Sequence, residues 1–249
     1  MTIIDFHTHL DDRWFDKPLP SAGEFLAAMD KHGVRASCIF TIMGLYGDCV
    51  RHNDALEAKA RTSPDRLIPF ATVDPKEGKA AVAELERRLA GGLFRGVKFH
   101  PWLQAFAPSM LKETMIDLLR CAARHRAPVI VHDGSPPYST TMQVAAMARW
   151  VPEATVVLSH AGSADYTWPA GQMIREIPNL HACFCGPRAG DLEYLVEAGG
   201  AEKVLFGSDF GAAKPEILAE RIDDAMAAMM SPEDRVKVMG GNAAKMLGL

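Results

Sequence analysis

Short segments rich in Ile, Val, Leu and Phe recur along the 249 residues, and longer segments with a different periodicity separate them. Gly, Pro or Asp bounds each short segment, which predicts buried β-strands. The eight segments are 2–9, 36–43, 67–74, 94–101, 128–134, 155–162, 180–186 and 203–211. Between them, stretches such as 21–33, 79–92, 109–125 and 215–230 space apolar residues three or four apart, with charges on the opposite face. That spacing predicts amphipathic helices.

Alternation of strands and helices is typical of α/β proteins, either as a closed parallel barrel or as an open doubly wound sheet. The count of eight strands favours a single (β/α)8 TIM barrel of the metallo-dependent hydrolase type, and 249 residues is close to the usual length of such a barrel. Neither GxGxxG after the first strand nor GxxxxGK occurs, so the nucleotide-binding signatures of the open sheet are missing. We find no repeat or linker that divides the chain, and we expect one domain spanning 1–249.

Composition and charge argue against nucleic acid and membranes as partners of this chain. Hydrophobic residues make up 48% and charged residues 23%, and the net charge of −4 provides no basic surface for nucleic acid. No apolar run reaches the roughly 20 residues of a membrane span, and the N-terminus lacks the pattern of a signal peptide. The five cysteines include no CxxC pair, which argues against a disulfide framework or a thiolate zinc site. We expect a cytoplasmic protein that binds a small molecule.

Polar residues gather where the predicted strands end. His7 and His9 point to the same face of the first strand, roughly 7 Å apart, so they can share a metal ion. The alternative for such a pair is one histidine at a polar strand end and one in solvent. The strand-end residues together are His7, His9, Lys98, His100, His132, His160 and Asp209. In a parallel barrel these ends meet on one face, where barrel enzymes build their active sites.

This set of side chains predicts a metal site. Within it, four histidines and one carboxylate suit Zn²⁺, and Mn²⁺, Fe²⁺ or Co²⁺ as well; they are His7, His9, His132, His160 and Asp209. A catalytic zinc needs three or four protein ligands at about 2.0–2.2 Å and an open position for water. A metal ion at such a site lowers the pKa of bound water to roughly 7 and so provides a nucleophile at neutral pH.

The segments DFHTH, GVKFHP, VHDG, LSHAG and GSDFG, in this order, resemble the amidohydrolase superfamily. They are most similar to its amidohydrolase-2 branch, which includes aminocarboxymuconate semialdehyde decarboxylase and related metal-dependent hydrolases, decarboxylases and hydratases. The resemblance extends from the first strand to the closing GNAAKMLGL. It implies one divalent metal ion, most simply Zn²⁺, held by four ligands: His7, His9, His132 and Asp209.

The resemblance also implies roles for two further residues. His160 matches a histidine that acts as acid, base or carbonyl polariser in single-metal members and is a ligand in two-metal members. Lys98 lies near the position of a carboxylated lysine that bridges the ions of two-metal members. A GVKxHP-like segment usually accompanies one metal in this branch, so we expect Lys98 to be a substrate-binding or structural residue.

The leading functional prediction is hydrolysis of a small carboxylated or cyclic compound, such as a lactone or an amide. Metal-bound water would attack a carbonyl, Asp209 would take the proton of the water, and His160 would polarise the carbonyl or protonate the leaving group. A non-oxidative decarboxylase with the same metal site is the alternative, and a catalytically silent ligand-binding barrel is a third. A TatD-type deoxyribonuclease is disfavoured because such enzymes usually carry Glu after the fourth strand, where this chain has Lys98 and His100.

Four residues are candidates for substrate binding: Lys98, His100, Trp102 and Arg188. Arg188 is included because an arginine on a strand-to-helix loop can bind a carboxylate through two parallel hydrogen bonds. The Met-rich stretch 225–230 has helical spacing and is typical of core or a subunit interface, which leaves a homodimer open.

Overall fold

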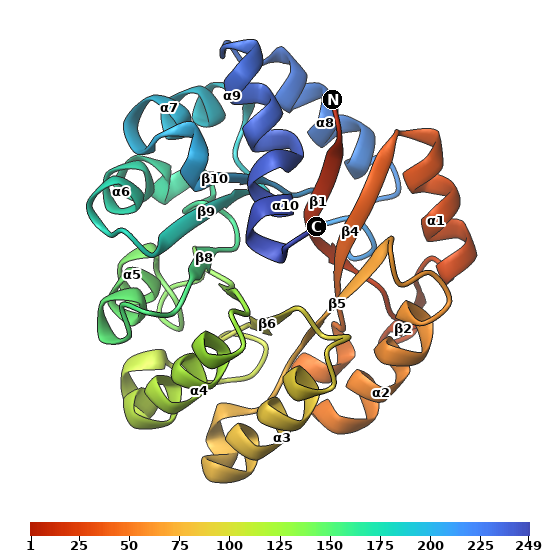
Figure 1. Ribbon diagram of the computed structural model, residues 1–249, viewed down its shortest axis with the longest axis vertical. Helices are drawn as coiled ribbons and strands as arrows, with labels where there is room; N and C mark the ends of the chain where they lie inside the picture. The colour runs from red at the N-terminus through yellow and green to blue at the C-terminus, as the bar shows by residue number, and fades with distance from the viewer.

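The eight predicted strands form one parallel sheet that curves into a barrel, with helices around it (Figure 1). The computed structural model covers residues 1–249, and the side chains it describes are those of residues 1–163 and 166–249. The strands, in their order around the sheet, are β1 Ile3–His9, β4 Val34–Phe40, β5 Leu67–Ala71, β6 Gly96–Phe99, β7 Val129–Val131, β8 Val156–Leu158, β9 Leu180–Phe184 and β10 Val204–Phe206. The predicted (β/α)8 barrel is confirmed.

Helices follow the strands and cover the outside of the barrel. They are α1 Ala22–Lys31, α2 Cys49–Ala60, α3 Lys79–Ala90, α4 Lys112–Arg124, α5 Thr141–Trp150, α6 Ser163–Glu176, α7 Ala189–Gly199, α8 Ile217–Ala227, α9 Pro232–Val236 and α10 Asn242–Leu247. The four stretches with helical spacing contain α1, α3, α4 and α8. None of the helices among the described residues is both long and apolar enough to cross a membrane.

The first and last strands meet through the segment that follows β10. The amide of Asp209 donates to the carbonyl of His7 at 2.9 Å, and the amide of His9 donates to the carbonyl of Phe210 at 2.8 Å. Gly211, with φ of +96°, makes this approach possible, because a Cβ there would lie 1.7 Å from the carbonyl oxygen of His9. The closure therefore brings Asp209 beside the two histidines of β1.

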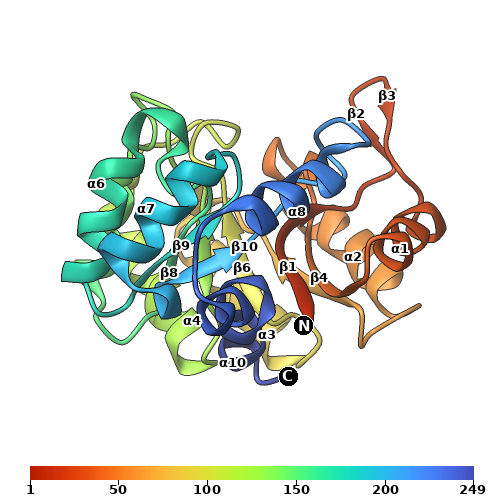
Figure 2. The same cartoon turned by 90° about the horizontal axis from the view of Figure 1, so that it is seen from above.

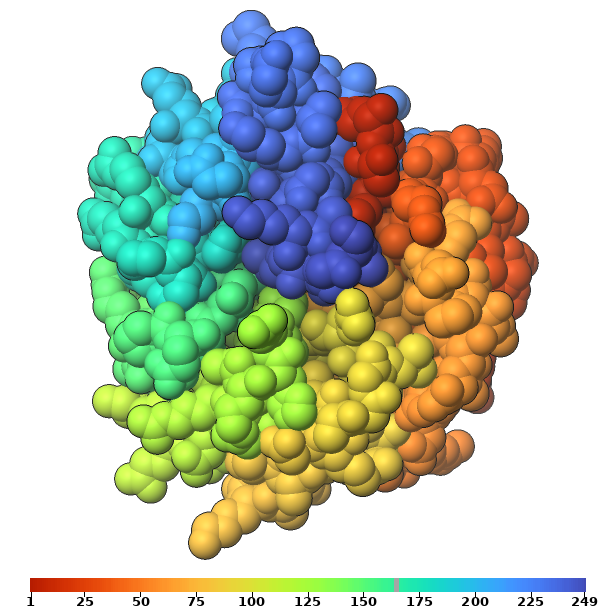
Figure 3. Space-filling model, viewed as in Figure 1, coloured from red at the N-terminus to blue at the C-terminus, as the bar shows by residue number. Residues whose placement is uncertain are grey.

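Two apolar layers stabilise the barrel. Strand residues that point outward pack against the helices, and those that point inward fill the barrel, since successive side chains alternate between the two faces. The inner layer contains Phe6, Phe40, Phe70, Ile130, Val157 and Leu205. Helix α10 packs its Ala243 and Leu247 against this layer at the end where the strands begin. The dark blue C-terminal segment covers the centre of that face in Figure 3.

The opposite end of the barrel, where the strands finish, carries a small hairpin. Strands β2, Arg13–Trp14, and β3, Lys17–Pro18, pair antiparallel in the loop after β1. Figure 2 shows this hairpin at the far end from α10 and from both chain termini. It stands beside the cavity described next and contributes Trp14 to the lining.

Candidate active site

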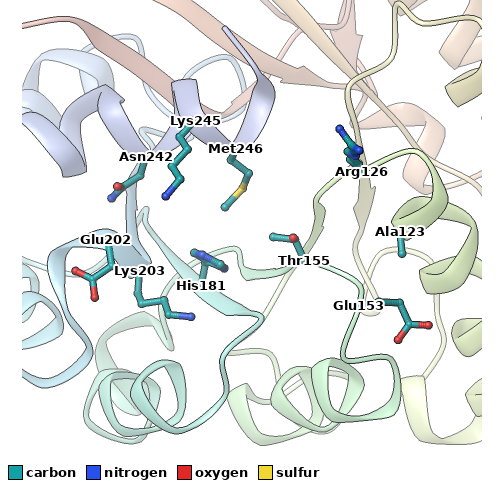
Figure 4. A pocket seen from close by; sticks show the side chains of 10 residues that line it. All are labelled: Ala123, Arg126, Glu153, Thr155, His181, Glu202, Lys203, Asn242, Lys245 and Met246. Carbon is teal, nitrogen blue, oxygen red and sulfur yellow. The ribbon is translucent and has the colours of Figure 1, made fainter.

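All seven polar residues predicted at strand ends line one cavity of about 300 Å³. Its remaining lining is apolar or aromatic and consists of Trp14, Ile42, Trp102, Leu103, Ala212 and Ala213. A larger hollow of about 420 Å³ lies at the other end of the barrel beside α10 (Figure 4), but none of the predicted site residues line it. The chemistry of the lining, and not the volume, therefore identifies the candidate site.

Three of the four predicted metal ligands lie together. Oδ1 of Asp209 is 3.6 Å from Nε2 of His7 and 3.3 Å from Nε2 of His9. Ligand atoms bound tetrahedrally at about 2.1 Å are about 3.4 Å apart, so these spacings suit one divalent ion. Nδ1 of His9 is buried without a hydrogen-bond partner among the described residues, while Nε2 faces the carboxylate of Asp209. The residues present fit a metal ion.

Lys98 lies directly beside this trio. Its side chain is 1% exposed, and Nζ donates to Oγ of Ser159 at 2.6 Å and lies 3.2 Å from Nε2 of His7. Burial lowers the pKa of Lys98 to about 8. Ser159 is also 3.2 Å from Nδ1 of His7, so it links the lysine to the histidine. Sequence reasoning missed Ser159, although it directly precedes His160 in the LSHAG segment.

His132 and His160 form a second group. Nε2 of His160 is 2.9 Å from Nδ1 of His132, and Nδ1 of His160 is 2.7 Å from the carbonyl oxygen of Cys185. A carbonyl only accepts, so Nδ1 of His160 donates to it and Nε2 of the neutral ring accepts from His132. Nε2 of His132 then accepts from Oγ of Ser135 at 2.7 Å. Burial holds the pKa of both imidazoles below the ordinary value, which favours these neutral rings.

The fourth predicted ligand therefore stands apart from the other three. The groups of described residues whose ligand atoms lie within 4.8 Å of one another are His7, His9 and Asp209, and His7, His160 and Cys185. His132 belongs to neither, since its two ring nitrogens already contact His160 and Ser135. Metal ligation by His132 would require it to give up one of these contacts. Its ligand role stays a prediction.

Two of the predicted substrate-binding residues, His100 and Trp102, line the cavity, His100 buried and Trp102 exposed. The ring of His100 stacks on the ring of His132, with centroids 3.7 Å apart and an interplanar angle of 12°. Trp102 is 54% exposed and its ring centroid is 6.1 Å from that of His100. An aromatic side chain in this position can cover a bound ring and still face solvent.

The structure does not bring Arg188 to the cavity. Its side chain is 83% exposed, and its Nε lies 3.6 Å from a carboxylate oxygen of Asp191. Arg188 immediately precedes α7, and Asp191 is in the first turn of that helix. The helix start therefore accounts for the position of Arg188, and the expected contact with a substrate carboxylate is not supported.

Sequence reasoning also missed two aspartates with fully buried side chains next to the predicted residues. Asp5 accepts hydrogen bonds from the backbone amides of His7 and Ser208, and Asp133 accepts from the backbone amide of His160. Burial raises the pKa of Asp5 to about 7. The sequence signal was present, since Asp5 belongs to DFHTH and Asp133 to VHDG.

Comparison with known proteins supports the resemblance to the amidohydrolases along nearly the whole chain. The sequence profile of the family described as Amidohydrolase matches residues 4–249, and no curated protein matches the chain. Among solved structures, 5-carboxyvanillate decarboxylase LigW from Sphingomonas paucimobilis is similar with a TM-score of 0.79 and 15% identity, over 100% of this chain and 99% of that chain. A dihydroxybenzoic acid decarboxylase from Polaromonas sp. JS666, with bound manganese and the inhibitor 2-nitroresorcinol, has a TM-score of 0.78 and 17% identity, with coverage of 100% and 97%. The 4-oxalomesaconate hydratase LigJ from Rhodopseudomonas palustris has a TM-score of 0.75 and 17% identity, with coverage of 99% and 96%.

Proposed function

Since the chain belongs to the amidohydrolase family, we propose that it is a metal-dependent decarboxylase that removes CO2 from a small, single-ring carboxylic acid. The observation that carries this choice of reaction is the similarity to two decarboxylases of aromatic acids over nearly the full length of both chains. The sequence slightly favoured hydrolysis, with decarboxylation as the alternative. The comparisons favour the alternative, and it becomes the leading proposal.

The dimensions and lining of the cavity support a small substrate with one acidic group. About 300 Å³ is the lower end of the range for ligand pockets. Trp14, Ile42 and Leu103 provide apolar wall for a ring. Among the residues that the structure describes, no arginine lines the cavity. The lining therefore best fits a substrate whose single carboxylate faces the histidines and whose ring faces the apolar wall.

One divalent ion would be held by His7, His9 and Asp209. Nitrogen ligands with one carboxylate suit both Zn²⁺ and Mn²⁺, and one of the similar decarboxylases contains manganese. When bound, such an ion supplies Lewis-acid polarisation of oxygen atoms on the substrate. The ammonium of Lys98 adds a second positive charge 3.2 Å from Nε2 of His7, and this charge attracts the substrate carboxylate.

The paired imidazoles provide the proton that the reaction needs. In decarboxylation the bond between the ring carbon and the carboxylate breaks, CO2 leaves, and the electron pair stays on the ring carbon until that carbon takes a proton. His160 and His132 share a hydrogen bond of 2.9 Å inside the cavity, and Ser135 extends it at 2.7 Å. In this proposal the Nδ1 proton of His132 moves to Nε2 of His160 as His160 gives a proton from Nε2 to the ring carbon, and the hydroxyl of Ser135 supplies the replacement proton at Nε2 of His132.

Hydrolysis is the second candidate, because one specific observation favours it. Oδ1 of Asp209 lies within 3.6 Å of both histidines of β1, where a carboxylate can accept a proton from water. The same donor set therefore suits an attack by water on a lactone or an amide. A silent ligand-binding barrel is disfavoured by the seven polar groups that meet in one cavity.

A substrate panel tests the proposal. Protein loaded with Mn²⁺ or Zn²⁺ is offered hydroxybenzoic acids, lactones and amides, and the release of CO2 and of acid is followed in parallel. We expect CO2 in stoichiometric amount from at least one aromatic acid and none from the Asp209→Asn variant. Acid release from a lactone or an amide without CO2 from any acid would overturn the proposal in favour of the hydrolase.

A further inference from the structure

Two aspartates are buried on opposite sides of the site, and neither forms an ion pair with a described side chain. Asp5 lies on β1 and Asp133 directly follows His132, and both are 0% exposed. Burying a carboxylate away from water is unfavourable, so these positions require specific hydrogen bonds in compensation. Backbone amides and hydroxyl groups donate these hydrogen bonds to each carboxylate, and they lie at the strand ends that carry the candidate catalytic residues.

Asp5 joins the two strands that carry the clustered ligands. Its Oδ1 accepts from the amide of His7 at 3.2 Å and from the amide of Ser208 at 3.0 Å, and its Oδ2 accepts from Oγ of Ser208 at 2.5 Å. Oγ of Ser208 in turn accepts from the amide of Phe210 at 3.0 Å. Asp5 thus contacts the backbone amides of His7 and Ser208 directly, and the amide of Phe210 through the hydroxyl of Ser208. Ser208 and Phe210 are the two sequence neighbours of Asp209.

The backbone that Asp5 contacts adopts an uncommon conformation. Asp209 has φ of +65°, in the left-handed region that is unfavourable for a non-glycine residue. Such a residue keeps this conformation only when its surroundings fix it. The hydrogen bonds from Ser208 to Asp5 fix the chain on one side of Asp209, and the amide of Phe210 is fixed on the other. They maintain the 3.6 Å separation between Asp209 Oδ1 and His7 Nε2.

Asp133 makes the equivalent connection on the side of the paired imidazoles. Its Oδ1 accepts from the amide of His160 at 2.7 Å, and its Oδ2 accepts from the amide of Gly162 at 2.7 Å and from Oγ1 of Thr141 at 3.4 Å. Ala161, between the two amides, also has positive φ, at +49°. Asp133 therefore holds the turn that orients the ring of His160 toward His132.

We propose that Asp5 and Asp133 are positioning residues with separate tasks. Asp5 orients the metal-binding half, His7 and Asp209, and Asp133 orients the proton-transfer half, His160. Neither carboxylate touches the substrate in this assignment. The inference rests on the proposed metal site and proton donor, but it does not depend on whether the reaction is decarboxylation or hydrolysis.

The test compares Asp5→Ala, Asp5→Asn and Asp133→Ala with the control Asn179→Ala. Asn179 donates to three backbone carbonyls at the opposite end of the barrel, so its loss destabilises the fold without disturbing the site. Affinity for Mn²⁺ or Zn²⁺ is measured by chelator competition, without substrate. We expect Asp5→Ala to weaken affinity 10–100-fold, the usual effect of removing a group that orients a ligand. Asp5→Asn keeps an oxygen that can accept from the amides of His7 and Ser208, so this variant should retain most of the metal affinity.

Asp133→Ala should leave metal affinity within about twofold of the parent and lower kcat by roughly 10²-fold, because it misplaces a proton-transfer group. The ¹⁵N resonances of the imidazoles give a readout that needs neither metal nor substrate. Asp5→Ala should shift those of His7 more than those of His160, and Asp133→Ala should do the reverse. Equal metal affinities for Asp5→Ala and Asn179→Ala, or equal effects of both aspartate variants on both rings, would overturn the inference. A wild-type protein that retains no metal would overturn the proposed function, while the imidazole resonances would still decide the positioning roles.

Discussion

Replacing Lys98 with Met should stabilise the metal-free protein. Lys98 is 1% exposed, and its burial lowers its pKa from the ordinary 10.5 to about 8. At about 1.4 kcal/mol per pH unit, this difference corresponds to about 3 kcal/mol of unfavourable free energy for the charged amine at neutral pH. Met has a similar length, needs no solvation and removes this cost. The lost hydrogen bond to Ser159 offsets about 1 kcal/mol, so the net gain is about 2 kcal/mol.

The size of the stabilisation should depend on pH in a defined window. The pKa of Lys98 is lower in the folded than in the unfolded protein, so the unfolded state binds more protons between pH about 8 and 10.5. Wild-type stability attributable to this group therefore rises with pH across that window, whereas the variant lacks the effect. The advantage of Lys98→Met is full at pH 7 and should largely vanish near pH 10.

Thermal unfolding of chelator-treated protein from pH 7 to 10 measures both effects. A gain of about 2 kcal/mol raises Tm by roughly 4–8 °C for a chain of this size. Lys17→Met, at an exposed position of β3, serves as the control and should leave Tm unchanged. A Lys98→Met variant that is less stable at pH 7, or an advantage that is constant with pH, would refute the electrostatic reasoning.

The remaining predictions concern the metal and the substrate. Elemental analysis after dialysis should find about one divalent ion per chain; a value near two would make Lys98 a bridging residue. His160→Asn should retain the metal and lower kcat by roughly 10²–10⁴-fold in steady-state assays, and metal loss would make His160 a ligand. Trp102→Ala should raise KM several-fold with kcat within about twofold, because the ring is removed from the mouth of the cavity and not from the reacting atoms; an equal fall in kcat would contradict a purely binding role.

The sequence predicted the barrel and the location of the site because both follow from periodicity and topology. Apolar strands that alternate with amphipathic helices close into a parallel barrel, and the ends of such strands meet on one face. His7, Lys98 and Asp209 belong to three different strand segments far apart in sequence, yet they line one cavity. The second strand began earlier than predicted, at Val34, because Val34 is buried and pairs with Ile3 of β1.

The contacts of individual side chains could not be predicted in the same way. Asp5 and Ser208 are separated by 203 positions, and nothing in local periodicity indicates that their side chains meet. Arg188 has the residue type of a carboxylate-binding group, but its Nε lies 3.6 Å from Asp191 in the first turn of the helix that it precedes. The pairing of His132 with His160 likewise depends on the separation of two neighbouring strand ends.

The fate of the proton tests the central claim most directly. Loss of CO2 leaves a carbon that must take a proton from an exchangeable group, so reaction in D2O with metal-loaded protein should place one deuterium on that ring carbon. We predict one carbon-bound deuterium per CO2 released, measured by mass spectrometry and NMR of the product, and strongly slowed release with His160→Asn. Product formation with no carbon-bound deuterium and no CO2, but with ¹⁸O in a new carboxylate when the reaction is run in H2¹⁸O, would contradict the account and identify a hydrolase.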